Sequence, residues 1–227
     1  MRAFAKVIIT TLLTIGAAPG GPQDPPRGQA ASKKDGKAAD DPAIAAGRWY
    51  VYRDSDSEEN HGEWTNWMPA EAKDMKQDFS LTDEKDPFQG STCIRISLKF
   101  LPPDWCGLAV SCKADYWGEV ADDSAFDLRK AQKLVFYARG AKGGERVQVK
   151  VGVLGDKKFG DSAKTPLMTP QLTLTKSWKR YELKVRPGTN LSRIVTPFCI
   201  VASRAANTDE SITVYFDQIY FEGVEAI

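Results

Sequence analysis

The sequence predicts an all-β fold in which two antiparallel sheets pack as one jelly-roll-like sandwich. Short runs alternate between apolar and polar residues, and Pro-, Gly- and Asp-rich turns separate them. No long stretch with helical periodicity follows the first twenty residues, although residues 127–132 could form one helical turn. Residues 47–227 are long enough for one such domain, and no internal repeat indicates a second.

Composition excludes some classes of partner. The chain has 227 residues, of which 42% are hydrophobic and 27% are charged, as in an ordinary globular protein. The formal net charge is +1. A nearly neutral chain has no electrostatic basis for binding nucleic acid or an anionic membrane surface.

The first 46 residues differ from the rest. Arg2 and Lys6 precede an apolar run over residues 7–15, and small residues follow it. This order is typical of a secretory signal peptide, which we predict for residues 1–20. Residues 21–46 contain almost no large apolar side chains and are predicted to be a disordered linker. The mature protein is therefore expected to be secreted or periplasmic, without a membrane span.

Seven strands follow from alternation of apolar and polar side chains. In the run at 146–153, for example, four valines at odd positions oppose Arg146, Gln148 and Lys150. The predicted strands, in order, cover residues 93–100, 105–110, 134–139, 146–153, 180–185, 198–202 and 212–221. Turn residues separate several of them, namely 102–104, 140–144, 155–156 and 187–188.

The last strand changes phase. Its apolar residues lie at even positions up to Phe216 and at odd positions from Ile219 onward, with Asp217 at the change. A β-bulge adds one residue to a strand and would account for this shift.

The evidence for catalysis is weak. His61 is the only histidine, which excludes multi-histidine metal sites, and no nucleophile-elbow motif is present. Acidic clusters at residues 54–59, 83–86 and 122–123 lie in polar, turn-like sequence, where solvated loop charge is the usual explanation.

Aromatic side chains outside the core phase favour sugar binding instead. Sugars are held by aromatic rings together with hydrogen-bonding side chains. Tyr137 and Arg139 point away from the core side of their strand, and we expect them to lie alongside Gln148 and Lys150 on the next strand. Trp105, Tyr116 and Trp117 would lie at the edge of this face. Alternatively, the loop aromatic residues cap the ends of the sandwich.

The four cysteines are Cys93, Cys106, Cys112 and Cys199. Export would permit disulfides. Cys106 and Cys112 lie too far apart along one strand to pair without a turn between them. Buried free thiols and a Cys93–Cys199 bridge both remain open.

Four segments in order resemble a known fold family. They are "WCGLAVSCKADYWGE", "FDLRKAQKLVFYARG", "SWKRYELKV" and "ITVYFDQIYFE". Together they resemble the galactose-binding-like β-sandwich over about residues 49–222. Within that fold the chain is most similar to carbohydrate-binding modules such as family eleven, and to exported bacterial proteins of uncertain role. The resemblance implies non-catalytic binding of a polysaccharide or glycan.

The same resemblance implies a structural calcium ion beside the final strand. Asp217 matches the position of one ligand, and the acidic loop over residues 53–60 offers Asp54 or Glu59 as another. Carboxylates and backbone carbonyls are the ligands that Ca²⁺ prefers. The alternative is an aspartate simply exposed at the sandwich edge.

Glycan binding is therefore the function that the sequence favours. An extracytoplasmic structural or protein-interaction domain of the same fold is the second hypothesis, because fold alone does not fix function. A polysaccharide hydrolase or lyase is the third.

Overall fold

The computed structural model describes residues 47–67, 77–100 and 104–224; the predicted signal peptide and nearly all of the predicted linker lie outside them. This part of the chain contains twelve strands and no helix. The strands are β1 (Arg48–Tyr52), β2 (Glu63–Trp67), β3 (Asp78–Asp83), β4 (Cys93–Lys99), β5 (Trp105–Ser111), β6 (Lys133–Gly140), β7 (Arg146–Val151), β8 (Leu167–Met168), β9 (Leu172–Thr173), β10 (Lys179–Lys184), β11 (Phe198–Ser203) and β12 (Ser211–Glu222).

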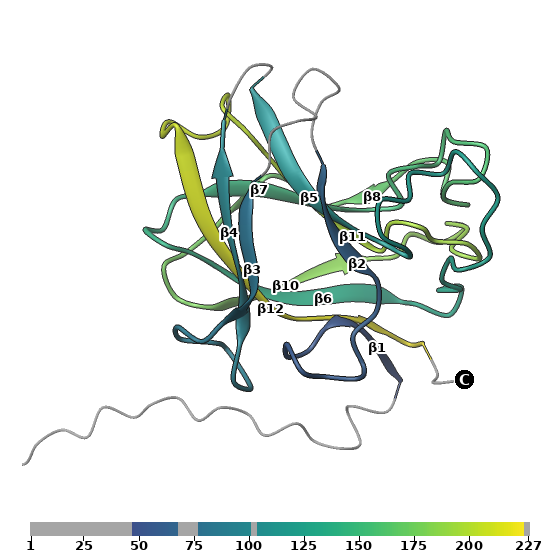
Figure 1. The fold of residues 1–227 in the computed structure, drawn as a ribbon, viewed down its shortest axis with the longest axis horizontal. Coiled ribbons are helices and arrows are strands. Elements are labelled where there is room, and N and C mark those ends of the chain that lie inside the picture. The colour runs from purple at the N-terminus through teal and green to yellow at the C-terminus, as the bar shows by residue number, and fades with distance from the viewer. Residues whose placement is uncertain (1–46, 68–76, 101–103, 225–227) are drawn as a thin grey trace, which may run out of the picture. The chain divides into compact units, whose positions relative to one another are not determined.

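The strands form two antiparallel sheets, as predicted (Figure 1). Sheet A has the order β10-β6-β12-β4-β3, and β1 also pairs with β12. Sheet B has the order β2-β5-β11-β7-β8, and β9 pairs with β7. The long connections between strands lie largely beyond β8, at one end of the sheets (Figure 1). No helix in the described ranges is long and apolar enough to cross a membrane.

The core lies between the sheets and follows the predicted alternation. Phe136 and Phe216 of sheet A meet Phe198 of sheet B, with ring centroids 5.8 to 5.9 Å apart. All three side chains are fully buried. Aromatic packing of this kind adds to the hydrophobic contribution of burial, so the three rings help to hold the two layers together.

The periodicity predicted seven strands, and the structure confirms all of them within one or two residues. Five strands lie outside these seven predictions, namely β1, β2, β3, β8 and β9. β2 and β3, with the sequences "EWTNW" and "DFSLTD", contain few apolar residues, and β8 and β9 have only two residues each. Residues 127–132 form a turn closed by a hydrogen bond from the amide of Ala131 to the carbonyl of Leu128, and no helix.

The predicted β-bulge is present in β12. Residues 211–216 of this strand pair with β4, whereas residues 219–222 pair with β1. Between them the register to β6 shifts after Asp217, and Gln218 adopts a φ of 47°. The phase change therefore occurs where one long strand exchanges one neighbour for another.

Asp217 and Gln218 lie where β12 stops pairing with β4 and begins to pair with β1. The Asp217 carboxylate accepts the backbone N–H of Gln89 at 3.0 Å and that of Gln218 at 2.7 Å. The Gln218 side chain donates to the carbonyl of Arg53 at 2.7 Å. Asp217 is 0% exposed, so the alternative of an acid exposed at the sandwich edge is wrong.

All four cysteines are free thiols. Cys93 faces outward from sheet A and Cys199 faces outward from sheet B, so the two could not form the bridge considered above. Burial raises the pKa of Cys93 and of Cys106 to about 12. Thiols with such a high pKa are poor nucleophiles, so these two are expected to be chemically inert.

The buried carboxylate of Asp217 predicts a pH dependence of stability. Burial raises its pKa to about 7, although hydrogen bonds from Gln89 and Gln218 oppose the shift. The folded state thus holds a proton that the unfolded state releases near pH ~4, so stability falls as pH rises from there through 7. We expect the wild type and Asp217→Asn to unfold with similar free energies at low pH.

At a pH above 7 the wild type should be less stable than Asp217→Asn, by roughly 1–4 kcal/mol. Urea unfolding of both proteins across this pH range measures the difference. A parallel pH profile for the two proteins would contradict the assignment to Asp217.

Candidate functional site

The structure separates the residues predicted to form one binding face. Tyr137 and Arg139 lie on β6, which pairs with β10 and β12 in sheet A. Gln148 and Lys150 lie on β7, which pairs with β11 and β8 in sheet B. The predicted arrangement is wrong because the turn after β6 crosses from one sheet to the other. The two pairs consequently lie on opposite outer faces.

On sheet A, other side chains cover Tyr137 and Arg139. The ring of Phe88 stacks on Tyr137 with centroids 3.7 Å apart and planes 15° apart. Arg139 is only 8% exposed, and its guanidinium lies 3.8 Å from the ring centroid of Tyr215 and 5.1 Å from that of Trp178. Cation–π contacts of this kind stabilise the fold and leave little of the guanidinium for a ligand.

The segment that carries Phe88 is fixed in place. Arg139 donates to the carbonyl of Lys85 at 3.2 Å, and the indole of Trp178 donates to the carbonyl of Asp86 at 2.9 Å. Elsewhere on the same face Val135 and Tyr220 are 0% and 3% exposed. The outer face of sheet A is therefore mostly closed.

On sheet B, the predicted residues Trp105, Gln148 and Lys150 lie on the same face as Trp67, which was not among the predicted site residues. Trp67, Gly107, Val201 and Gln148 form one cross-strand row over β2, β5, β11 and β7. Trp105 and Lys150 project from the same side of the sheet. We call Trp67, Trp105, Gln148 and Lys150 the tryptophan face.

The tryptophan face is partly open to solvent. All four of its side chains are of intermediate exposure. The rings of Trp67 and Trp105 are 5.5 Å apart at 71°, and the Lys150 ammonium lies 5.7 Å from the centre of the Trp67 ring. Gly107 has no side chain between Trp67 and Val201, where a Cβ would meet the carbonyl oxygen of Ile200 at 2.1 Å.

This arrangement can hold a polar ring. Aromatic faces bind the apolar faces of sugars, and the amine of Lys150 can donate to hydroxyl groups. The Gln148 amide donates to the carbonyl of Thr169 at 2.9 Å, which fixes its orientation. The face therefore combines two aromatic rings with adjacent polar groups.

Trp67 could have been identified from the sequence. Residues three apart on a strand face opposite sides, so Trp64 and Trp67 in "EWTNW" cannot both be core residues. The ring of Trp64 packs inside against Phe198, with centroids 6.0 Å apart, and Trp67 is left outside. The other residues of the segment are polar, so it lacks the alternation that predicts a strand.

Tyr116 and Trp117 lie apart from these strands, in the connection after β5. Tyr116 is 6% exposed and packs with Leu154 and Val195, and Trp117 packs against the same cluster. The Tyr116 hydroxyl donates to the carbonyl of Val120 at 2.6 Å. These contacts agree with the alternative that loop aromatic residues cap the end of the sandwich.

The three predicted calcium ligands are all engaged by donors. Asp54 accepts hydrogen bonds from Ser91 and Thr92, including the Ser91 amide at 2.7 Å. These bonds lower the pKa of Asp54 against the opposing effect of its partial burial. Glu59 forms an ion pair with Arg53.

Backbone and side-chain donors of residues 88–92 thus bond to the carboxylates of Asp54 and Asp217, which hold this segment in place. A Ca²⁺ ion bound to these carboxylates would need further oxygen ligands around it, but N–H and O–H donors already point at the carboxylates. In the described ranges no group of three or more His, Cys, Asp or Glu side chains could hold a metal ion. As arranged, the three acids do not fit a shared calcium ion, and its presence stays a prediction.

Known proteins share the fold. The structure of a family 30 carbohydrate-binding module matches with a TM-score of 0.50 and 14% identity, over 79% of this chain and 89% of that one. The family 30 module of a Clostridium thermocellum cellulosomal cellulase, Cel9D-Cel44B, matches with a TM-score of 0.48 and 15% identity, over 78% of this chain and 97% of that one. A variant of a family 29 module matches with a TM-score of 0.45 and 9% identity, over 79% of this chain and 94% of that one.

The chain has the β-sandwich fold of carbohydrate-binding modules, and at these identities the matches establish the fold alone. No protein-family profile and no curated protein matches the sequence.

Calcium removal tests the role of the acids. Because donors from residues 88–92 already satisfy Asp54 and Asp217, we expect the thermal unfolding midpoint to be the same in calcium and in chelator. Differential scanning calorimetry measures it. A midpoint that rises with calcium concentration would instead support the ligand set implied by the resemblance.

Proposed function

We propose that the protein is a non-catalytic carbohydrate-binding module that binds a polysaccharide or glycan on the tryptophan face. The observation that carries this proposal is the pairing of Trp67 and Trp105 beside Lys150 on the partly open outer face of sheet B. The fold shared with a family 30 module supports it. The proposal includes secretion, which is supported by the basic residues followed by an apolar run within residues 1–20.

The shape of the face favours a polymer over a small apolar ligand. Its residues come from three strands of one sheet, β2, β5 and β7, with β11 between β5 and β7, so the side chains are spread across a surface instead of enclosing a cavity. Rings that stand at 71° to each other offer contacts to sugar units in different orientations. Lys150 lies beside the Trp67 ring, where its ammonium can donate to hydroxyl groups of a bound sugar.

Protein binding is the second candidate. Met168 is 43% exposed and pairs with Lys150 at the edge of the same face. Exposed methionine and tryptophan side chains are also common at protein interfaces. A partner protein captured through this face, with no polysaccharide bound, would favour this candidate.

The structure offers no comparable support for a hydrolase or lyase. The only histidine, His61, stacks on Trp49 with ring centroids 4.4 Å apart, and its Nδ1 lies 2.8 Å from the carbonyl oxygen of Tyr50. No Ser, Thr or Cys side chain of the described residues hydrogen-bonds to it. The His61 ring thus has structural contacts and no nucleophile beside it.

Substitution of the face tryptophans tests the proposal. Trp67→Ala and Trp105→Ala should each weaken polysaccharide binding about tenfold or more, because each removes one of the two aromatic rings on which a sugar would stack. Lys150→Met should have a smaller effect. Affinity electrophoresis against a panel of soluble polysaccharides, followed by calorimetry on those that bind, measures the change.

Trp178→Ala is the matched control, because Trp178 contacts Phe88 and Arg139 on the other outer face. It should bind like the wild type. Equal losses in Trp67→Ala and Trp178→Ala, or no binding of any polysaccharide by the wild type, would contradict the proposal.

A further inference from the structure

β7 carries two basic side chains that have no acidic partner. Arg146 and Lys150 point to the same side of this strand as Gln148, because the three valines that alternate with them are 0% exposed in the core. This is the side that carries the tryptophan face. Within the described part of the chain, neither basic side chain forms an ion pair or donates a hydrogen bond.

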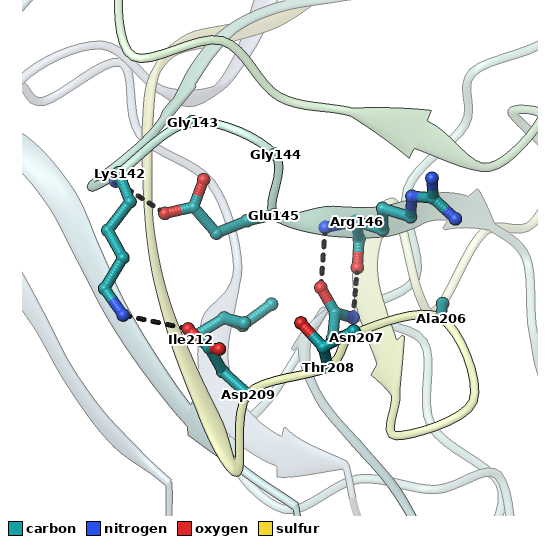
Figure 2. A pocket seen from close by; sticks show the side chains of 10 residues that line it. All are labelled: Lys142, Gly143, Gly144, Glu145, Arg146, Ala206, Asn207, Thr208, Asp209 and Ile212. Carbon is teal, nitrogen blue, oxygen red and sulfur yellow. Dashed lines mark hydrogen bonds and ion pairs between the residues drawn. The ribbon is translucent and has the colours of Figure 1, made fainter.

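Arg146 has no counter-charge although two acids line the same small cavity, between the β6–β7 and β11–β12 turns. Asp209 pairs with the Lys142 ammonium at 2.8 Å, and Glu145 Oε1 accepts the Lys142 amide at 2.7 Å. Figure 2 shows the Arg146 guanidinium extending away from both acids. The Asn207 side chain bonds to the backbone N–H and carbonyl of Arg146 at 2.8 and 2.9 Å, so the start of β7 is held while the guanidinium stays exposed.

The Lys150 ammonium lies beside an aromatic ring instead of an acid. Its Nζ is 5.7 Å from the centre of the Trp67 ring. Trp67 is on β2 and Lys150 on β7, with β5 and β11 between them, so the two side chains reach toward each other across the face. An aromatic ring attracts a cation without neutralising its charge, and the ammonium can still pair with an anion.

The cross-strand rows of this face contain no acid. One row holds Thr65, Ala109, Cys199, Lys150 and Met168, and the next holds Trp67, Gly107, Val201 and Gln148. Described acids lie at the margin instead. Asp115 accepts the Thr65 hydroxyl at 3.1 Å at the β2 edge, Glu63 begins β2, and Asp104 precedes Trp105. The charges borne by the rows and by β7 are therefore positive.

This distribution of charge favours an oxyanion as ligand. Hydrogen bonds between two charged groups are stronger than those between neutral groups. The planar guanidinium of Arg146 can bind both oxygens of a carboxylate or sulfate, whereas the ammonium of Lys150 acts as a point charge. Because the net charge of the whole chain is only +1, such recognition depends on these local charges and not on long-range attraction.

The separation of the two cations favours a polymer. Four residues of extended strand place the Cα atoms of Arg146 and Lys150 about 13 Å apart. A polysaccharide that bears an oxyanion at intervals can reach both cations at once. A sugar ring stacked on Trp67 would also bring a substituent at its edge toward the Lys150 ammonium.

We propose that the tryptophan face selects acidic polysaccharides, with Lys150 and Arg146 binding carboxylate or sulfate groups of sugars that stack on Trp67 and Trp105. This inference rests on the glycan-binding function proposed above and names its class of ligand. Lys150 and Arg146 determine specificity, whereas the two tryptophans supply contacts that acidic and neutral chains share.

Matched pairs of polysaccharides test the class of ligand. Polygalacturonate and its methyl ester share a backbone and differ in charge, and dextran sulfate and dextran form a second pair. We expect the full chain to bind the charged member of at least one pair about tenfold or more tightly than the neutral member at low ionic strength. Because salt screens exposed charges, the difference should fall to about threefold or less near ~0.5 M NaCl. Calorimetry measures both, and the pair that shows the difference distinguishes carboxylate from sulfate.

Substitution of the two cations tests their role. Lys150→Met and Arg146→Met should each weaken binding of the charged polysaccharide about threefold or more, with a smaller effect on its neutral partner. Lys150→Glu should weaken it about tenfold or more, because it introduces a like charge. Lys179→Met is the matched control, since Lys179 also lies over a ring, that of Tyr181 at 5.5 Å, but on β10 of sheet A. It should bind like the wild type.

Equal affinity for the two members of both pairs would overturn the proposal. So would a preference for charged chains that no Lys150 or Arg146 variant reduces, or equal affinity for polyglutamate, which carries the charge without the sugar. Trp67→Ala separates this inference from the proposed function. If Trp67→Ala weakens binding of a neutral polysaccharide and the wild type shows no preference for charge, glycan binding stands and acidic specificity alone is refuted.

Discussion

The bulge at Asp217 and Gln218 is the constraint on which the arrangement of sheet A depends. β12 pairs with β6 along its length, but on its other side it pairs first with β4 and then with β1. The bulge inserts one extra residue and bends the strand, and it lies where the neighbour changes. The Asp217 carboxylate then binds the amide of Gln89, which places Phe88 over Tyr137. The bulge thus helps to close the outer face of sheet A, whereas the outer face of sheet B stays partly open.

Local patterns predicted much of the fold because they report on burial one strand at a time. The alternation of apolar residues identified seven strands, and the phase change in the last strand located the bulge. Pairing between strands is a different kind of information. The turn over residues 141–145 has the glycines of a hairpin, yet it joins strands of different sheets. No local signal distinguishes these outcomes, so Tyr137 and Arg139 were placed beside Gln148 and Lys150 when they lie on opposite faces.

The candidate site shows the same division between local and non-local information. Trp105, Gln148 and Lys150 were found because each is polar or aromatic at an outward position. Trp67 was missed because β2 carries too few apolar residues to be recognised as a strand. Residues whose role comes from long-range packing need a structure to be found.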